Sequence, residues 1–383
     1  CLNVTVATSG KLTGAVDEST PNSSIVLGGT TNVPMAKYKF TATNEAFTVQ
    51  KLNVVLDNNN DFTDDSSDDT GTNNITKVSL SYPKKDGTTG TASANMASGK
   101  ASFTNLDFYV PKDGSAVITV LADINTIENG AESGAIFRLG LNEQSGMANN
   151  SFEAQCEGSN EKKTATSLST YTNSTAVKTM VVRKTMPAVA KSFNASTKLN
   201  NGTNDIATVT VTADAKGSVS FKRLIFQFNS SAMDINSLEL LRKIGSGPES
   251  SITNQVSIKN KFGANLKTGG ANLASNGNGS VIDKIYITWD NLETSEEYIS
   301  AGTTNTYILR ANVAYATANK FSATYIADDN SYVTTDAQNL LKDDTVNFIW
   351  SDNSAKNHST YTNDWTNGTD IPSLPTQTLS LSF

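Results

Sequence analysis

The strongest constraint on the fold is an internal repeat, in which two stretches half a chain apart follow the same pattern. Residues 36–56 and 207–228 each contain a segment of alternating apolar and polar residues, a short polar turn and a second apolar segment. Residues 116–124 and 305–313 form another matching pair at a similar separation. A repeat at this spacing indicates a duplicated module, and alternation with a period of two predicts that the module is built from β-strands.

The length of 383 residues and the repeat together predict two domains. Charged residues make up only 17% of the chain, whereas Thr, Ser, Asn and Gly are abundant, as in sheets joined by polar turns. Short strands spaced by turn residues are typical of β-sandwiches. We therefore expect an all-β chain of two tandem Ig-like β-sandwich domains, 1–185 and 186–383, with a long polar insertion or linker at 142–178 and a Trp-containing closing segment at the C-terminus.

The expected strands follow from this alternation. In the first domain they lie within 31–56 (two strands) and at 75–82, 101–110, 116–124 and 136–141. In the second domain they lie near 206–213, 219–229, 237–242, 252–258, 281–289, 305–313, 321–327 and 345–350.

Composition also limits the classes of function. The formal net charge of −7 disfavours nucleic acid as a partner, because phosphates attract basic surfaces. No run of 18 apolar residues is present, so no transmembrane segment is expected. Two cysteines without a CxxC spacing exclude a zinc ribbon and disfavour a redox motif. Sparse cysteine, low charge and many Asn and Thr residues indicate an exported protein.

Segments spread over most of the chain carry a resemblance to a known group of proteins. They are Ser9–Thr13, Val110–Ala116, Val181–Pro187, Asn347–Ala355, Asp364–Gly368 and Ile371–Leu379. In form and order these segments resemble those of repetitive β-sandwich cell-surface proteins of ultrasmall bacteria of the candidate phyla radiation. The resemblance implies exported, repetitive cell-surface material without an assigned reaction, and it suggests a surface layer or an appendage.

An acidic loop at residues 57–69 is the first candidate for a metal site. Asp57, Asn59 and Asp61 have the spacing by which alternate oxygens converge on Ca²⁺, and Asp68 falls at the twelfth position. The loop lacks the Gly of an EF-type loop at position six and has no flanking helix, so a solvated acidic loop is the alternative. The candidate calcium ligands are Asp57, Asn59, Asp61, Asp65 and Asp68. An alternative calcium site would use Asp328, Asp329, Asp343 and Asp344.

His358 is the only histidine in the chain, and its sequence neighbours are Ser, Asn and Lys residues. Hydrolysis centred on histidine needs a nucleophile and a carboxylate beside the imidazole, and the chain contains no G-x-S-x-G motif. We expect His358 to be a surface or loop-packing residue and the protein not to be an enzyme.

Three tryptophans, Trp289, Trp350 and Trp365, allow two interpretations. They would stack on the sugar rings of surface glycans in a carbohydrate-binding module, or they would fill the interior of the sandwich. The position of Trp350 at a strand end, and of Trp365 in the closing segment, favours the structural interpretation.

Cys1 also has alternative roles. It would carry a lipid anchor, as the first residue of bacterial lipoproteins does, or form a disulfide with Cys156, which an oxidising compartment permits. Two free thiols are the third alternative.

Both ends of the chain have the alternation of amphipathic strands. The apolar positions are Leu2, Val4, Val6, Leu379, Leu381 and Phe383. A terminal strand completes its own sheet or inserts into the sheet of a neighbouring copy. Self-completion is the simpler expectation, and exchange would polymerise the protein.

These observations favour a self-assembling extracellular structural protein of the cell surface, most simply an S-layer subunit whose contacts with other copies are bridged by Ca²⁺. A filament polymerised by exchange of terminal strands is the alternative. A carbohydrate-binding adhesin is the third hypothesis. The expected partners are copies of the same chain and surface glycans.

Overall fold

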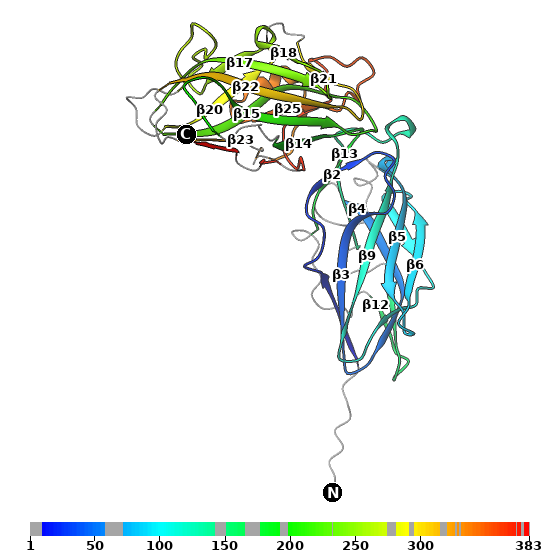
Figure 1. The fold of residues 1–383 in the computed structure, drawn as a ribbon. Helices are drawn as coiled ribbons and strands as arrows, with labels where there is room; N and C mark the ends of the chain where they lie inside the picture. The colour runs from blue at the N-terminus through cyan, green and yellow to red at the C-terminus, as the bar shows by residue number, and fades with distance from the viewer. Residues whose placement is uncertain are drawn as a thin grey trace. The chain divides into compact units, whose positions relative to one another are not determined.

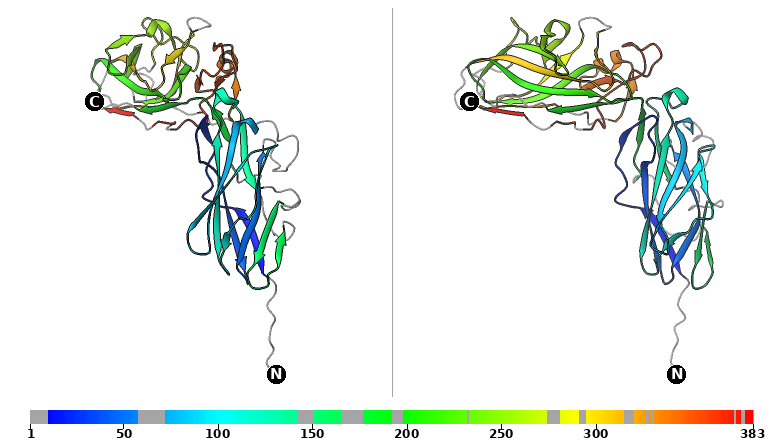
Figure 2. Two further views of the ribbon diagram at one scale, coloured as in Figure 1. Left: turned by 90° about the vertical axis from the view of Figure 1, so that its right-hand side faces the viewer. Right: turned by 45° about the vertical axis from the view of Figure 1, so that its right-hand side comes forward.

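A computed structural model describes residues 10–57, 72–141, 151–164, 177–191, 198–231, 233–273, 281–290, 295–314, 320–325, 328, 331–372, 374–376 and 379–382. The chain divides into two compact units, Cys1–Arg183 (unit 1) and Lys184–Phe383 (unit 2). The sequence placed this boundary after residue 185. In the views of Figure 2, each unit is built from extended strands arranged in layers.

Unit 1 contains two β-sheets. The first has the strand order β1-β3-β9-β5-β6 (Figure 1). Its strands are β1 (Lys11–Val16), β3 (Val33–Thr43), β5 (Ile75–Pro83), β6 (Thr89–Asn95) and β9 (Ser115–Ile124). The second sheet has the order β12-β11-β4-β10-β13-β2, and two further strands, β7 and β8, pair with β4. Its strands are β2 (Ser24–Leu27), β4 (Phe47–Asp57), β7 (Lys100–Phe103), β8 (Phe108–Val110), β10 (Ile136–Leu141), β11 (Phe152–Cys156), β12 (Lys162–Thr164) and β13 (Met180–Arg183). Two 3₁₀ turns are η1 (Thr72–Asn74) and η2 (Ile127–Asn129).

Unit 2 repeats this plan. One sheet has the order β14-β15-β22-β17-β18. Its strands are β14 (Pro187–Lys191), β15 (Gly202–Ala213), β17 (Asp234–Ile244), β18 (Glu249–Ser251) and β22 (Thr304–Ala314). The other has the order β19-β20-β16-β25-β26-β24, with β21 and β23 paired to β16, and β27 to β23. Its strands are β16 (Val219–Ser230), β19 (Ser257–Asn260), β20 (Val281–Thr288), β21 (Glu297–Ile299), β23 (Lys320–Tyr325), β24 (Thr334–Thr335), β25 (Phe348–Ser351), β26 (Trp365–Thr366) and β27 (Leu379–Ser382). The helical elements are η4 (Thr253–Gln255) and α1 (Ala337–Lys342).

The duplication seen in the sequence is visible in the topology. The first matching pair of segments becomes β3 and β4 in unit 1 and β15 and β16 in unit 2, and the second becomes β9 and β22. In each unit the strand from the second pair hydrogen-bonds to the first strand of the first pair: β9 to β3, and β22 to β15. The structure confirms the predicted fold class, an all-β chain of two tandem Ig-like β-sandwiches.

Alternation of apolar residues explains how each unit acquires its core. In β9 every second side chain is buried, as expected for a strand with one face toward the interior. In unit 2, the Phe221 ring lies 4.9 Å from Trp289 and 5.4 Å from Tyr307, each edge to face. Such aromatic contacts add to the hydrophobic stabilisation of the buried area.

Some sequence predictions were wrong in detail. The expected strand 101–110 is interrupted, because Asn105 adopts a left-handed conformation (φ 57°) between β7 and β8. The expected strand 252–258 is replaced over part of its length by η4, where Thr253 Oγ1 accepts a hydrogen bond from the Leu240 N–H. The insertion expected at 142–178 contains β11, which pairs with β4, and β12. Phe152, Ala154 and Cys156 are buried in β11, so the loop assignment overlooked a short period-two pattern.

Candidate functional site

The closing segment of unit 2, residues 347–368, contains a network of hydrogen bonds around residues that the sequence singled out. Its strands β25 and β26 pair with each other, so that Trp350 lies opposite Thr366. The Trp350 indole Nε1–H donates to the Asn367 carbonyl oxygen at 2.8 Å, and Asn367 Nδ2 donates to the Ser331 carbonyl oxygen at 3.0 Å. These bonds fold the segment back onto the β16 sheet.

All three tryptophans are buried. Trp350 and Trp365 have no exposed surface, and Trp289 is 1% exposed. The Trp365 indole N–H donates to the Ser359 carbonyl oxygen at 2.8 Å. The structural interpretation of the tryptophans is therefore confirmed, and none of the three presents a ring for sugar stacking. Binding to surface glycans stays a prediction without a tryptophan to support it.

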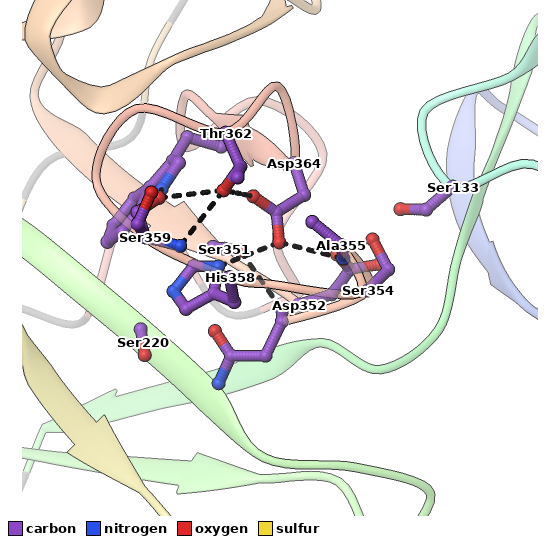
Figure 3. A network of polar contacts seen from close by, with 12 residues as sticks. Ser133, Ser220, Ser351, Asp352, Ser354, Ala355, His358, Ser359, Thr362 and Asp364 are labelled. Carbon is purple, nitrogen blue, oxygen red and sulfur yellow. Dashed lines mark hydrogen bonds and ion pairs between the residues drawn. The ribbon is translucent and has the colours of Figure 1, made fainter.

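His358 lies between two carboxylates, those of Asp364 and Glu296; Figure 3 shows the side that faces Asp364. Its Nδ1 is 2.8 Å from Asp364 Oδ2, and its Nε2 is 3.1 Å from Glu296 Oε2. The imidazole stacks on Trp365, with ring centroids 5.3 Å apart. Only 14% of the His358 side chain is exposed. The histidine is thus a loop-packing residue, as expected, but its two acidic partners were not foreseen.

Further hydrogen bonds hold both carboxylates in place. Asp364 Oδ1 accepts from Thr362 Oγ1 at 2.6 Å, and Oδ2 accepts from the Ala355 N–H at 3.1 Å. Glu296 Oε1 accepts from Ser220 Oγ, on β16, at 3.2 Å. The network therefore connects the closing segment to the strand at the centre of its sheet.

The charges of this network reinforce one another. Burial lowers the pKa of His358, but the hydrogen bonds and charges of Asp364 and Glu296 outweigh it and raise that pKa to about 9. Burial raises the pKa of Asp364, but His358 and Thr362 outweigh this effect and lower that pKa to about 2. At neutral pH the arrangement is consequently a carboxylate–imidazolium–carboxylate array.

This geometry makes His358 the centre of an ion-pair network. Both ring nitrogens of His358 are engaged by carboxylates, and Ser220 donates to Glu296 instead of to the imidazole. A general base at neutral pH needs a free nitrogen lone pair, which an imidazolium lacks.

Asp328 is a second buried acidic residue of the closing region, 5% exposed. Its carboxylate accepts hydrogen bonds from the backbone N–H groups of Asn347, Phe348 and Gly368. Burial raises the pKa of Asp328, an effect that these three donors oppose. The carboxylate thereby joins the strand β25 to the residues that follow β26.

The described members of the alternative calcium site are Asp328, Asp343 and Asp344. Asp343 Oδ1 accepts from the Thr345 N–H at 2.8 Å and from its hydroxyl at 2.6 Å. Asp344 lines a cavity of about 310 Å³ together with Arg223 and Lys259. Asp329 lies outside the described residues. Within the described ranges no group of three or more His, Cys, Asp or Glu side chains is placed to hold a metal ion.

The first calcium loop is described only at its start. Asp57, the last residue of β4, has a fully buried side chain, and its Oδ2 lies 2.7 Å from Nη2 of Arg138. A guanidinium therefore already neutralises this carboxylate. Asn59, Asp61, Asp65 and Asp68 lie outside the described residues, so calcium binding by this loop stays a prediction.

Arg223 is a buried residue whose role the sequence did not reveal. Its Nη1 donates to the carbonyl oxygens of Asp343 and Val346, and its Nη2 donates to that of Leu341. The guanidinium thus stabilises the turn between α1 and β25, and burial lowers its pKa. The sequence signal was the Lys222–Arg223 pair in a strand with no other charged residue, which a solvated position explains equally well.

The terminal features are partly described. β27 pairs antiparallel with β23, and Leu381 is 2% exposed, so this C-terminal strand completes its own sheet in the structure. Cys156 is a buried free thiol. Leu2, Val4, Val6, Phe383, the side chain of Leu379 and Cys1 lie outside the described part, and the predictions about them remain untested.

No protein-family model matches the chain, and no curated protein matches it. Solved structures are similar at low identity. The C-terminal domain of the AgI/II polypeptide BspA of Streptococcus agalactiae is 13% identical, with 83% of this chain and 96% of that chain covered, at a TM-score of 0.20. A type II cohesin dyad from the adaptor ScaA scaffoldin of Acetivibrio cellulolyticus is 10% identical, with 92% and 96% covered, at a TM-score of 0.19.

The C-terminal domain of the Streptococcus pyogenes antigen I/II-family protein AspA is similar at 9% identity, with 84% of this chain and 96% of that chain covered, at a TM-score of 0.19. Likeness at this level carries no argument about function. No helix in the described ranges is long and apolar enough to cross a membrane.

Proposed function

We propose that this protein is a self-assembling structural component of an extracellular cell surface, with an S-layer subunit as the specific form. The observation that carries the proposal is the use made of His358, Trp350, Trp365 and Asp328. Trp350, Trp365 and Asp328 are buried and His358 is largely buried, and each forms hydrogen bonds that hold the closing segment of unit 2 in place. Because these groups stabilise the fold of unit 2, they favour a structural role over a catalytic one.

The architecture supports the same role. Each sandwich is a compact unit, and its exposed strand edges and loops provide contacts for other copies. The resemblance of the closing segment and other motifs to cell-surface proteins of ultrasmall bacteria points in the same direction. The net charge of −7 also makes divalent cations useful, because they would bridge copies that otherwise repel each other.

The proposal is tested by sedimentation of the purified protein over a range of concentrations, with millimolar calcium and with excess chelator. An S-layer subunit is expected to form large assemblies with calcium and to disperse with chelator. A protein that stays monomeric under both conditions at high concentration would contradict self-assembly. Assemblies that persist in chelator would contradict only the bridging role of calcium and would leave self-assembly supported.

A filament is the second candidate, and β27 favours it. This four-residue strand pairs only with β23 among the described strands, and buries Leu381 against its own unit. A short terminal edge strand of this kind is suited to exchange between copies. Deletion of residues 377–383 should then abolish fibres and leave the monomer able to accept a peptide of that sequence. Fibres that persist after the deletion would exclude exchange of this strand.

A further inference from the structure

The edge strand β6 of unit 1 lacks the protection that the other edges carry. Natural edge strands avoid pairing with other chains by being short or by carrying charges, prolines or bulges. β6 has seven residues, Thr-Gly-Thr-Ala-Ser-Ala-Asn, with none of these features, and its register with β5 is continuous. Figure 1 shows it at the outer edge of its sheet, beyond β5.

Several other edge strands carry such features. In unit 2 the equivalent strand β18 has three residues, and its Glu249 forms an ion pair with Arg310 at 3.2 Å. β14 begins with Pro187 and ends with Lys191, and β12 contains two lysines. Among the described edge strands, β6 is the longest without a charged residue or proline. The two copies of the module thus differ at this edge.

The hydrogen-bond pattern shows which backbone groups of β6 face outward. The Lys84 N–H donates to the Thr88 carbonyl oxygen at 2.9 Å, so Lys84 and Thr88 face each other as a bonded pair. Bonded and non-bonded pairs alternate along an antiparallel ladder. The residues whose N–H and C=O groups point away from β5 are therefore Thr89, Thr91, Ser93 and Asn95. Pro83, which has no N–H, lies opposite Thr89, as a non-bonded pair allows.

The outward residues are available for pairing. The side chains of all four are exposed, and no hydrogen bond to the outer backbone of β6 occurs among the described residues. The intervening residues are Gly90, Ala92 and Ala94, and Ala92 and Ala94 pack against the core of unit 1. The ring of Tyr82 covers Gly90 so closely that a Cβ at residue 90 would lie 2.4 Å from it.

We propose that β6 pairs antiparallel with β6 of a second copy, about a twofold axis at Ala92. In this register Thr91 faces Ser93 of the other copy and Thr89 faces its Asn95, so every outward N–H and C=O meets a partner. Thr–Ser pairs are favourable across antiparallel strands, and no charges oppose each other. The two five-stranded sheets join into one continuous sheet. This dimer contact rests on the proposed function, of which it names one interface.

A second copy suits the edge better than an unrelated strand does, because the pattern is self-complementary. The outward residues occur at every second position, symmetrically about Ala92, so the same register satisfies both copies. A twofold contact of this kind is isologous and closes on itself. It therefore supplies a dimer from which a larger assembly is built through other surfaces.

Ser93→Pro tests the contact, with Ser93→Ala as its matched control. Proline removes an outward N–H but no bond to β5, and prolines are tolerated on edge strands at such positions. In chelator, sedimentation equilibrium of the full chain should show a dimer for the wild type and for Ser93→Ala. Ser93→Pro should weaken dimerisation about tenfold or more. Equal dimerisation of the two variants would overturn the proposal.

Cysteine crosslinking tests the register and does not depend on the folding of the proline variant. Residues at the twofold axis form a non-bonded pair with Cα atoms about 4.5 Å apart, within disulfide range. In a Cys1→Ser background, Ala92→Cys should form a covalent dimer on mild oxidation, whereas Ala94→Cys, which would face Gly90, should not. Equal crosslinking of both variants, or of neither, would overturn the assigned pairing.

The outcomes separate this contact from the proposed function. A dimer in chelator that depends on Ser93, without larger assemblies in calcium, would support the β6 contact and contradict the surface layer. Large calcium-dependent assemblies that are indifferent to Ser93→Pro would support the layer and contradict the contact. A wild-type chain that is monomeric throughout would contradict both.

Discussion

His358 and Asp364, six residues apart in one loop, face each other with Nδ1 and Oδ2 separated by 2.8 Å. Glu296, from a different part of unit 2, approaches the opposite ring nitrogen at 3.1 Å. The single histidine of the chain is therefore the centre of an ion-pair network that connects the closing segment to its sheet. We expect the main effect of its removal to be a lower stability of unit 2.

We expect His358→Ala to destabilise unit 2 by about 2–3 kcal/mol, because two largely buried carboxylates lose their shared cation. Lys356→Ala, an exposed change in the same loop, is the control and should shift the free energy of unfolding by less than about 0.5 kcal/mol. Chemical denaturation of the two variants and the wild type measures the difference. Equal stabilities would show that the array contributes nothing to the fold.

The pKa values of the array predict how stability depends on pH. The pKa of His358 is about 9 when folded and 6.5 when unfolded, so its stabilisation is complete below pH 6.5 and is lost as pH rises through about 9. The pKa of Asp364 is about 2 when folded and 3.8 when unfolded, so its contribution is present above 3.8 and is lost as pH falls through about 2. The melting temperature should therefore decline at alkaline pH, as His358 loses its proton, and at strongly acidic pH, as Asp364 gains one. His358→Gln should flatten the decline at alkaline pH.

Asp328→Ala should destabilise unit 2 by about 3 kcal/mol, since three buried backbone N–H groups lose their acceptor. The loss should be the same with calcium and with chelator. Asp344→Ala removes an exposed carboxylate of the same unit that accepts no hydrogen bond from the described residues, and serves as the control. If the effect of Asp328→Ala disappeared in chelator, Asp328 would be a calcium ligand instead of a backbone acceptor.

The acidic loop after β4 gives a separate prediction. If it binds Ca²⁺, Asp61→Ser and Asp68→Ser should each weaken calcium binding about tenfold or more, because each removes a charged oxygen ligand. Isothermal titration with calcium measures the affinity. Asp113→Ser, in the turn before β9, is the control for a general loss of negative charge. Unchanged affinity in both loop variants would leave the loop as a solvated acidic segment.

The fold was predictable because its information is local. Alternation in segments such as Ala116–Ile124 requires one buried face, and the repeat fixes the number of units. The strands that escaped prediction were weakly patterned. β6 consists of small polar residues and Gly, and β11 buries only three side chains within a polar stretch.

Only part of the ion-pair network around His358 was predictable from the sequence. Asp364 lies near His358 in sequence, but Glu296 is 62 residues away and reaches the imidazole only through the tertiary fold. Arg223 and Asp328 were obscure for the same reason, because their partners are mainly backbone groups of distant turns. Backbone acceptors and donors leave no signature in side-chain identity. A sequence therefore indicates which residues are unusual before it indicates what they bind.

The measurement that tests self-assembly most directly is negative-stain electron microscopy of the purified full chain, with calcium and then with excess chelator. We expect ordered sheets in calcium that disperse into small uniform particles when calcium is removed. Fibres unaffected by chelator would instead favour a filament formed by strand exchange through β27. Dispersed single chains under both conditions would contradict the proposal that this protein builds a surface from copies of itself.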